Sequence, residues 1–187
     1  MRLHHPFIRH SLTALCGLVM AVQAGAFELN SKDIQASKPM PKAQEYRGFG
    51  CDGGNRSPQL SWRDAPAGSK SFALTAYDPD APTGSGWWHW IVYNIPAEAH
   101  SLPGNAGDPA AKLMPAVASQ HRNDYGSNGF GGACPPKGDK AHRYQFTLYA
   151  LDVDHLEIAP QSSAALVGFM INSHKLGEAR LEALYQR

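Results

Sequence analysis

The chain has 187 residues, of which 43% are hydrophobic and 18% charged, and its formal net charge at pH 7 is +1. This length suits one domain with a hydrophobic core, and the composition excludes a disordered chain. The near-neutral charge, without a basic stripe, argues against nucleic acid or an anionic membrane surface as a partner.

The N-terminal residues have the pattern of a cleaved secretory signal. Arg2 and Arg9 precede the apolar run 11–22, and small residues follow it. The run is shorter than the roughly 20 residues that span a bilayer. We expect a signal peptide over residues 1–26, cleaved at Ala26 or at Ala24, no integral membrane segment after cleavage, and a periplasmic or secreted protein. Residues 27–187 would form the single mature domain.

Cleavage at Ala26 would remove Cys16 and leave Cys51 and Cys134 as the two cysteines of the mature chain. Two cysteines in an exported protein favour a disulfide bond. Two unpaired buried thiols are the alternative. Cleavage would also remove two basic residues and bring the net charge near −1.

Three clear strands are predicted along the mature chain, after one short strand within residues 27–41. They cover residues 71–77, which end at an Asp-Pro break, residues 87–95 and residues 143–151. Long segments rich in glycine and proline, 48–58 and 123–139, read as loops. The spacing of apolar residues after Ser162 predicts helix up to Arg187, as one interrupted helix or two short ones. The buried stripe of this helix is expected to contain Leu166, Phe169, Met170, Leu176, Leu181 and Leu184. The fold class is therefore mainly β, with Greek-key topology and a C-terminal helix.

Two aspartates stand in a stiff loop just after the first strand. Pro79 and Pro82 cannot donate ladder hydrogen bonds, and they would hold Asp78 and Asp80 in fixed directions. A surface turn would explain the same residues, because Asp and Pro are common in turns.

Two histidines lie in or beside the neighbouring strands. His89 is surrounded by tryptophans, and a buried imidazole needs hydrogen-bond partners. His142 opens the third strand, and Tyr144, two residues on, points to the same side. These residues would face one cavity, with Asp78 and Asp80 at its edge.

Three blocks in this order resemble the phosphatidylethanolamine-binding protein (PEBP) family, in particular its bacterial, Raf-kinase-inhibitor-like branch. They are DPDAP at 78–82, the strand around His89, and GGACPPKG at 131–138 followed by His142-Arg143-Tyr144. The resemblance extends from about Phe27 to the C-terminus. One departure is Ala133, where relatives often have proline.

The resemblance implies a β-sandwich-like fold and a small pocket for anions such as phosphate or a phosphoethanolamine head group. Carried over by motif, the ligand-binding residues are Asp78, Asp80, Pro82, Gly132, His89, Pro136, His142, Tyr144 and Tyr185. No catalytic residue, metal ion or other cofactor is implied, and no protein partner can be named.

An anion beside two carboxylates requires an electrostatic explanation. We expect Asp78 and Asp80 to orient the histidines and to favour the imidazolium form. His89, His142 and the Tyr144 hydroxyl would then contact the anion, with backbone N–H groups of Gly131 and Gly132 as further donors.

Three other functions stay open at this stage. Two His and two Asp would suit zinc or non-haem iron, although no His-x-His or similar spacing supports a metal site. The same residues would serve a weak hydrolase of small phosphate or carboxylic esters. The resemblance also allows an inhibitor or scaffold of an extracytoplasmic protease or a host factor.

Overall fold

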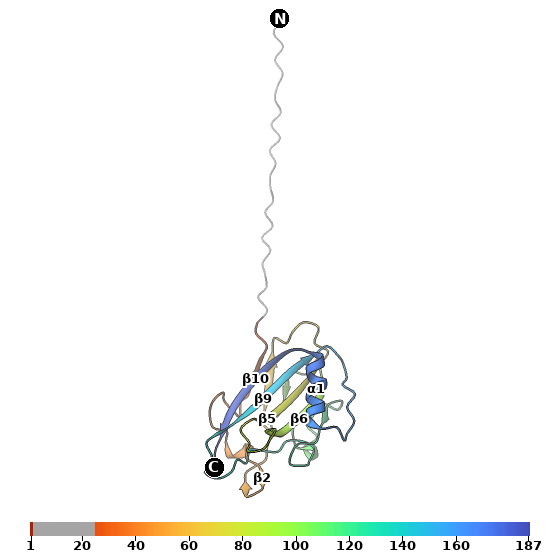
Figure 1. The fold of residues 1–187 in the computed structure, drawn as a ribbon. Coiled ribbons are helices and arrows are strands. Elements are labelled where there is room, and N and C mark those ends of the chain that lie inside the picture. The colour runs from red at the N-terminus through yellow and green to blue at the C-terminus, as the bar shows by residue number, and fades with distance from the viewer. Residues whose placement is uncertain (2–24) are drawn as a thin grey trace.

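A five-stranded antiparallel sheet forms the centre of the molecule in the computed structural model, which describes Met1 and residues 25–187. The strand order is β10-β9-β5-β6-β8, and Figure 1 shows β10, β9, β5 and β6 side by side. The strands are β5 (Ser71–Asp78), β6 (Trp87–Pro96), β8 (Ser119–Gln120), β9 (His142–Leu151) and β10 (Lys175–Tyr185). The predicted signal segment falls almost entirely on residues 2–24, which lie outside the described part.

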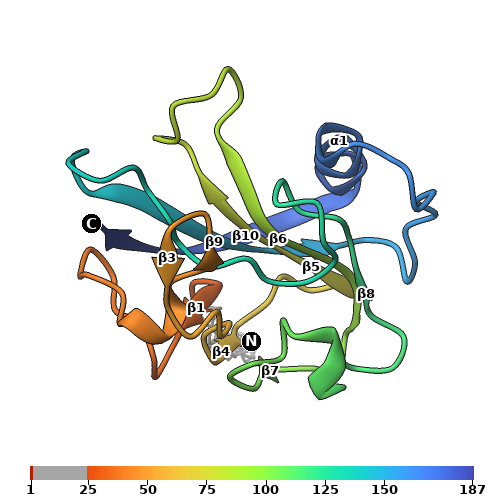
Figure 2. The same ribbon diagram turned by 90° about the horizontal axis from the view of Figure 1, so that it is seen from below.

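A second, three-stranded sheet packs on one face of the central sheet, and a helix packs on the other (Figure 2). Its order is β1-β4-β7, with β1 at Glu28–Asn30, β4 at Leu60–Arg63 and β7 at Ser101–Leu102. The helix is α1 (Ala164–His174). A small hairpin of β2 (Arg47–Gly48) and β3 (Cys51–Asp52) and two 3-10 turns, Lys42–Gln44 and Pro109–Ala111, complete the fold. The mainly-β prediction is confirmed.

The central strands are apolar on both faces because each face meets a separate core. Leu74 and Val92 belong to the cluster between the two sheets. Ala73 and Ile91, one residue away, belong to the cluster beneath α1, together with Ile171 of the helix. Alternate residues of a strand point to opposite faces, so a continuous apolar run is what this layered arrangement requires.

The prediction that helix continues to Arg187 is wrong. Helix α1 ends at His174, and β10 follows directly and pairs with β9 along its whole length, up to Tyr185 opposite His142. In β10 the buried residues alternate, with Ala179, Leu181 and Ala183 in the core. Pairing with β9 satisfies the backbone of this segment, so tertiary context overrides the helical spacing.

The predicted helical stripe is also wrong in α1. Leu166 and Phe169 are 47% and 65% exposed, whereas Val167 and Ile171 are buried. The helix is apolar around much of its circumference, so spacing alone did not identify the face that packs on the sheet. Within the described residues, no helix is long and apolar enough to cross a membrane.

Candidate functional site

One end of the central sheet brings the candidate residues together. Strand β5 ends at Asp78, which pairs with Trp87 at the start of β6. Strand β9, antiparallel to β5, begins at His142 beside the same end. His89 lies two residues after Trp87 in β6, and Tyr144 lies two residues after His142 in β9. Each therefore points to the same side of its strand as the residue that begins it. The antiparallel register therefore builds the site from segments about 60 residues apart.

A cavity of about 180 Å³ opens at this end of the sheet. Its wall includes six of the predicted residues, which are Asp78, Pro82, His89, Pro136, His142 and Tyr144. The remaining lining residues are Phe49, Ala81, Thr83, Trp87, Tyr125, Cys134 and Pro135. None of these seven was predicted as a ligand-binding residue, although Trp87 could have been found, because it is two residues from His89 on the same strand face.

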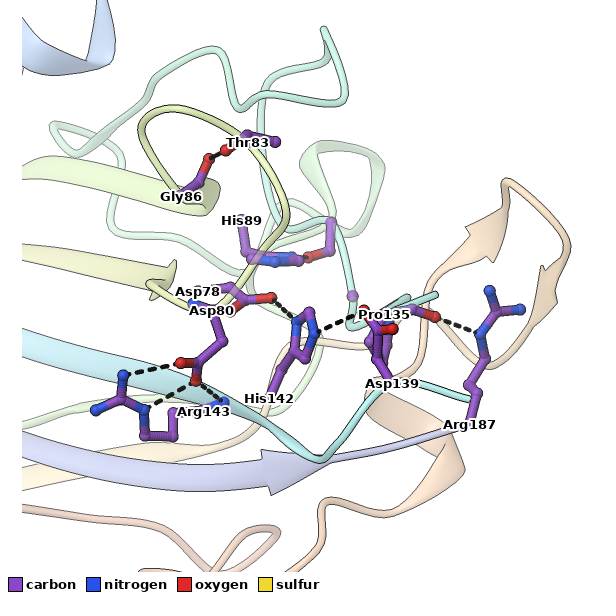
Figure 3. Close-up of polar contacts among 12 residues, drawn as sticks. Asp78, Asp80, Thr83, Gly86, His89, Pro135, Asp139, His142, Arg143 and Arg187 are labelled. Carbon is purple, nitrogen blue, oxygen red and sulfur yellow. Dashed lines mark hydrogen bonds and ion pairs between the residues drawn. The ribbon is translucent and has the colours of Figure 1, made fainter. Parts of the chain in front are cut away.

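His142 is held by a buried carboxylate. Its Nδ1 lies 2.8 Å from Oδ2 of Asp78, and both side chains are almost completely buried (Figure 3). On the other side of the ring, Nε2 lies 3.5 Å from Oδ2 of Asp139, a longer contact. Asp78 thus orients His142 as expected, and its second carboxylate oxygen accepts a hydrogen bond from the Asp80 amide.

His89 is held differently from the expectation. Its Nδ1 lies 2.7 Å from the carbonyl oxygen of Gly131, and no carboxylate hydrogen-bonds to the ring in the described residues. A carbonyl oxygen only accepts, so Nδ1 carries the proton and donates it. Burial lowers the pKa of His89, which favours the neutral ring. In that form Nε2 is a hydrogen-bond acceptor.

Asp80 does not orient a histidine, and this part of the expectation is corrected. Its two carboxylate oxygens accept hydrogen bonds from the Arg143 guanidinium at 2.8 and 2.9 Å, and one also accepts from the Arg143 backbone amide. Figure 3 shows this pair on the far side of Asp78 from His89. The hydrogen bonds from Arg143 lower the pKa of Asp80 to about 2. Asp80 therefore attaches the loop that follows β5 to strand β9, and it does not line the cavity.

Gly132 and Tyr185 also lie outside the cavity wall. The Gly132 amide donates to Oδ1 of Asn55, and its carbonyl accepts from the Tyr125 hydroxyl. The Gly131 amide donates to the His89 carbonyl, so neither glycine amide is available to a ligand. The Tyr185 hydroxyl donates to Glu45. Gly132 is needed for close packing, because a Cβ there would collide with backbone atoms of residues 44–46.

Two hydrogen-bonding groups of the cavity wall have no partner. The Tyr144 hydroxyl and the Trp87 Nε1 are buried without a hydrogen bond in the described part of the chain. Burial, and then the charge of Asp78, raise the pKa of Tyr144 far above its ordinary value, so the hydroxyl keeps its proton. Buried polar groups usually have partners. These two atoms are the strongest indication of a bound ligand.

A disulfide bond joins the two sides of the cavity mouth. Cys51 is the first residue of β3, directly after the hairpin turn, and it is bonded to Cys134. This is the cysteine pair that the sequence favoured. Phe49 at the tip of this hairpin lines the cavity and is 74% exposed. It packs beside Tyr125, which stacks on Tyr46 with ring centroids 3.8 Å apart. The mouth is therefore an apolar, cross-linked rim.

Metal ligation has little support in this geometry. No group of three or more His, Cys, Asp or Glu side chains is arranged to hold a metal ion in the described residues. The reason is local: His89 is held by a carbonyl, Asp80 by Arg143, and Cys134 by its disulfide partner.

The chain belongs to the phosphatidylethanolamine-binding protein family, whose family model matches residues 30–186. It is thus a ligand-binding protein of this family. It is 49% identical over 174 residues to the UPF0098 protein YbcL of Escherichia coli, covering 93% of this chain and 95% of the relative. It is 46% identical to YbhB of the same organism, covering 84% of this chain and 99% of the relative.

Solved structures agree with this assignment. The crystal structure of E. coli YbcL, described as a new member of the mammalian PEBP family, matches with a TM-score of 0.84 and 50% identity. The match covers 86% of this chain and 98% of the YbcL chain in that structure. A PEBP homologue from Chlamydia trachomatis, CT736, matches with a TM-score of 0.71 and 31% identity, covering 87% of this chain and 98% of that one.

Proposed function

We propose that this protein is an exported binding protein whose cavity holds the oxyanion of a small ligand, such as phosphate or a phosphoethanolamine-type head group. The observation that carries the proposal is the pair of unpartnered donors, the Tyr144 hydroxyl and Trp87 Nε1, in the wall of one cavity. Both groups can donate to oxygen, and an indole N–H can do nothing else. A ligand rich in acceptor oxygens would satisfy both.

The remaining wall supports a ligand with one polar end. Asp78 and His142 form a fixed polar floor, while Phe49, Pro82 and Pro135 supply apolar surface. Such a combination of a few convergent polar groups and an apolar lining is typical of small-molecule sites. The organic part of a head group would lie against the rim, and its oxyanion would accept hydrogen bonds from the Tyr144 hydroxyl and Trp87 Nε1.

Export is supported by the cysteine chemistry and by the N-terminal pattern. The Cys51–Cys134 disulfide is of a kind that persists in oxidising compartments and is rare in the cytosol. A periplasmic or secreted location is therefore part of the proposal. Expression of the full chain, followed by fractionation and N-terminal sequencing of the product, would locate the protein and distinguish cleavage at Ala24 from cleavage at Ala26.

A hydrolase receives less support from the same cavity. Thr83 and Cys134 are the residues of the wall that carry an aliphatic hydroxyl or a sulfur atom. The Thr83 hydroxyl donates to the Gly86 carbonyl at 2.6 Å, and Cys134 is bonded to Cys51. Neither is activated by an adjacent base, as a covalent nucleophile needs to be. We therefore propose binding rather than turnover, and the bound state would serve to modulate a partner protein.

Isothermal titration with phosphoethanolamine tests the binding proposal. Tyr144→Phe removes one hydrogen bond to the ligand, and a loss of about 1.4 kcal/mol would weaken binding about tenfold. Tyr149→Phe is the matched control. It lies on the same strand, but on the face that packs beneath α1, and it should bind like the wild type. The proposal fails if the wild type shows no binding, or if Tyr144→Phe binds as tightly as the wild type.

A further inference from the structure

The charges at the cavity do not match those of a dianion receptor. Within the described part of the chain, no Lys or Arg lines the wall. Two arginine side chains that adjoin residues of the wall have other partners: Arg143 bonds to Asp80, and Arg187 donates to the carbonyls of Gly50 and Pro135. An anion that enters the cavity meets no unoccupied permanent positive charge in its wall.

A buried carboxylate makes a second negative charge more costly. Asp78 lines the cavity, and its side chain is 4% exposed. Like charges close together in a poorly solvated site repel strongly. A second negative charge on the ligand would also be buried without a counter-charge, which is destabilising. Each further negative charge on the ligand would therefore weaken binding at this wall.

The hydrogen-bonding groups of the wall also include an acceptor. The His89 Nδ1 proton is committed to the Gly131 carbonyl, so Nε2 of the neutral ring needs a donor. Tyr144 and Trp87 present two donors without partners. A complementary ligand accepts hydrogen bonds at two oxygens and donates one from a third.

We infer that the cavity selects a singly charged oxyanion that still carries a proton, such as the monoanion of a phosphate monoester, over dianions of the same shape. This inference rests on the proposed function and makes it more specific. The ligand's P–OH group donates to Nε2 of His89, and its remaining oxygens accept from the Tyr144 hydroxyl and Trp87 Nε1. The single charge avoids repulsion by Asp78.

Several protein groups around His89 also titrate, so the test must separate their effects from those of the ligand. They come from β5, β9 and the loops after β8 and before β9, and are Asp78, His142, Tyr144, Asp124, Tyr125 and Asp139. Sulfate serves as the reference, because it stays a dianion between pH 5 and pH 8. Any pH dependence of sulfate binding reports the protein alone.

The experiment is isothermal titration of the mature protein with methyl phosphate and with sulfate from pH 5 to pH 8. The second pKa of a phosphate monoester lies near 6, so the monoanion fraction falls about 100-fold over this range. We expect methyl phosphate affinity, corrected for any change in sulfate affinity, to fall by about tenfold over this range if the dianion binds tenfold more weakly, and by up to about 100-fold if the dianion does not bind. At pH 5 we expect sulfate to bind at least about tenfold more weakly than methyl phosphate, the effect of one unfavourable charge–charge interaction of about 1.4 kcal/mol.

Two further measurements test the role of the proton. Dimethyl phosphate, which is singly charged without a proton, should bind more weakly than methyl phosphate at pH 5. His89→Asn keeps an amide donor for Gly131 and removes the acceptor at Nε2, so it should lose the preference for methyl phosphate over dimethyl phosphate. Tyr149→Phe should keep this preference. If His89→Asn does not fold, the affinities of the wild type for methyl phosphate and dimethyl phosphate still test the role of the ligand proton.

The outcomes separate this inference from the proposed function. Sulfate binding as tightly as methyl phosphate at pH 5 would overturn the inference and leave the oxyanion site standing. So would methyl phosphate affinity that does not change with pH. Equal affinity for dimethyl phosphate would overturn the role assigned to the ligand proton. Failure of all three ligands to bind at any pH would overturn both proposals.

Discussion

Asp78 ends β5 and Asp80 follows two residues later, yet the two aspartates contact different partners. Asp78 is buried against His142, and Asp80 pairs with the half-exposed Arg143. The chain turns at Pro79 and Asp80, where the Asp80 amide donates to Oδ1 of Asp78, so the two carboxylates contact different residues of β9. At the scale of single residues, one aspartate belongs to the ligand cavity and the other to its support.

We predict that Asp80→Asn lowers stability at neutral pH, with an effect that disappears in acid. Its hydrogen bonds to Arg143 lower the pKa of Asp80 to about 2, from an ordinary value of 3.8. A lowered carboxyl pKa stabilises the fold above the unfolded-state pKa, and this contribution is lost as the pH falls through the folded-state pKa. The difference in melting temperature between wild type and Asp80→Asn should therefore shrink between pH 4 and pH 2.

The control for this prediction is Asp154→Asn, which removes one negative charge from an exposed site after β9. It should change the melting temperature little at either pH. A constant difference between wild type and Asp80→Asn from pH 7 to pH 2 would contradict the assigned ion pair.

Tyr185 leads to a second prediction at this scale. Its hydroxyl donates to Glu45, which is 5% exposed and also accepts a hydrogen bond from the Asp52 amide. Tyr185→Phe would leave one carboxylate oxygen without its donor, at a cost of about 1–3 kcal/mol. Denaturant unfolding should show this loss. Phosphoethanolamine affinity should change less than in Tyr144→Phe, because Tyr185 does not line the cavity.

At the scale of elements, α1 attaches to the sheet through a narrow contact. Ile171 is 1% exposed in the core beneath the helix, whereas Leu166 on the same helix is 47% exposed. Ile171→Ala should therefore destabilise the protein by about 2–5 kcal/mol. Leu166→Ala should fall within about 0.5 kcal/mol of the wild type. Equal effects of the two substitutions on chemical unfolding would mean that the helix packs through a different face.

The disulfide bond attaches the β2–β3 hairpin to the loop before β9 and contributes to the stability of the fold. The bond joins residues 83 positions apart, and closing a loop of that length stabilises the fold by about 4 kcal/mol on the chain-entropy model. The double variant Cys51→Ser/Cys134→Ser should lose about that amount in denaturant unfolding without reductant. In the presence of reductant, the wild type should approach the variant. Stability of the wild type that is insensitive to reductant would argue that the bond is not formed in solution.

At the scale of the whole molecule, Arg187, which follows the last strand, joins two loops at the rim of the cavity. Arg187, just after β10, donates to the Pro135 carbonyl at 2.7 Å and to the Gly50 carbonyl at 2.8 Å. It therefore bridges the two loops that the disulfide also joins. Figure 3 shows Arg187 reaching Pro135 beside the cavity.

We predict that Arg187→Ala weakens ligand binding by loosening this rim. Two charge-assisted hydrogen bonds are lost, each worth about 1.5–3 kcal/mol in favourable settings and less at an exposed one. Affinity for phosphoethanolamine should fall several-fold while the melting temperature changes little, because the bonds lie outside both cores. Arg63→Ala, which breaks an exposed contact with Glu28 far from the cavity, is the control and should leave affinity unchanged.

Local sequence patterns are enough to predict the mainly-β class, the strands β5, β6 and β9, and the favoured cysteine pair. They also identify Asp78, His89, His142 and Tyr144 as a group. Strand periodicity, the Asp-Pro break after Tyr77 and the two-residue spacing of side chains are local properties, and they are visible without a fold.

The conformation of the last segment and the partners of His89 and Asp80 depend on the folded arrangement of distant segments. Residues 175–185 are strand because β9 offers them backbone partners, which no local spacing reveals. Likewise, His89 faces a carbonyl and Asp80 faces Arg143, whereas the sequence suggested that each acid would orient a histidine. Hydrogen-bond pairing depends on which distant atoms the sheet register brings within 3 Å, so it becomes known only when the whole chain is folded.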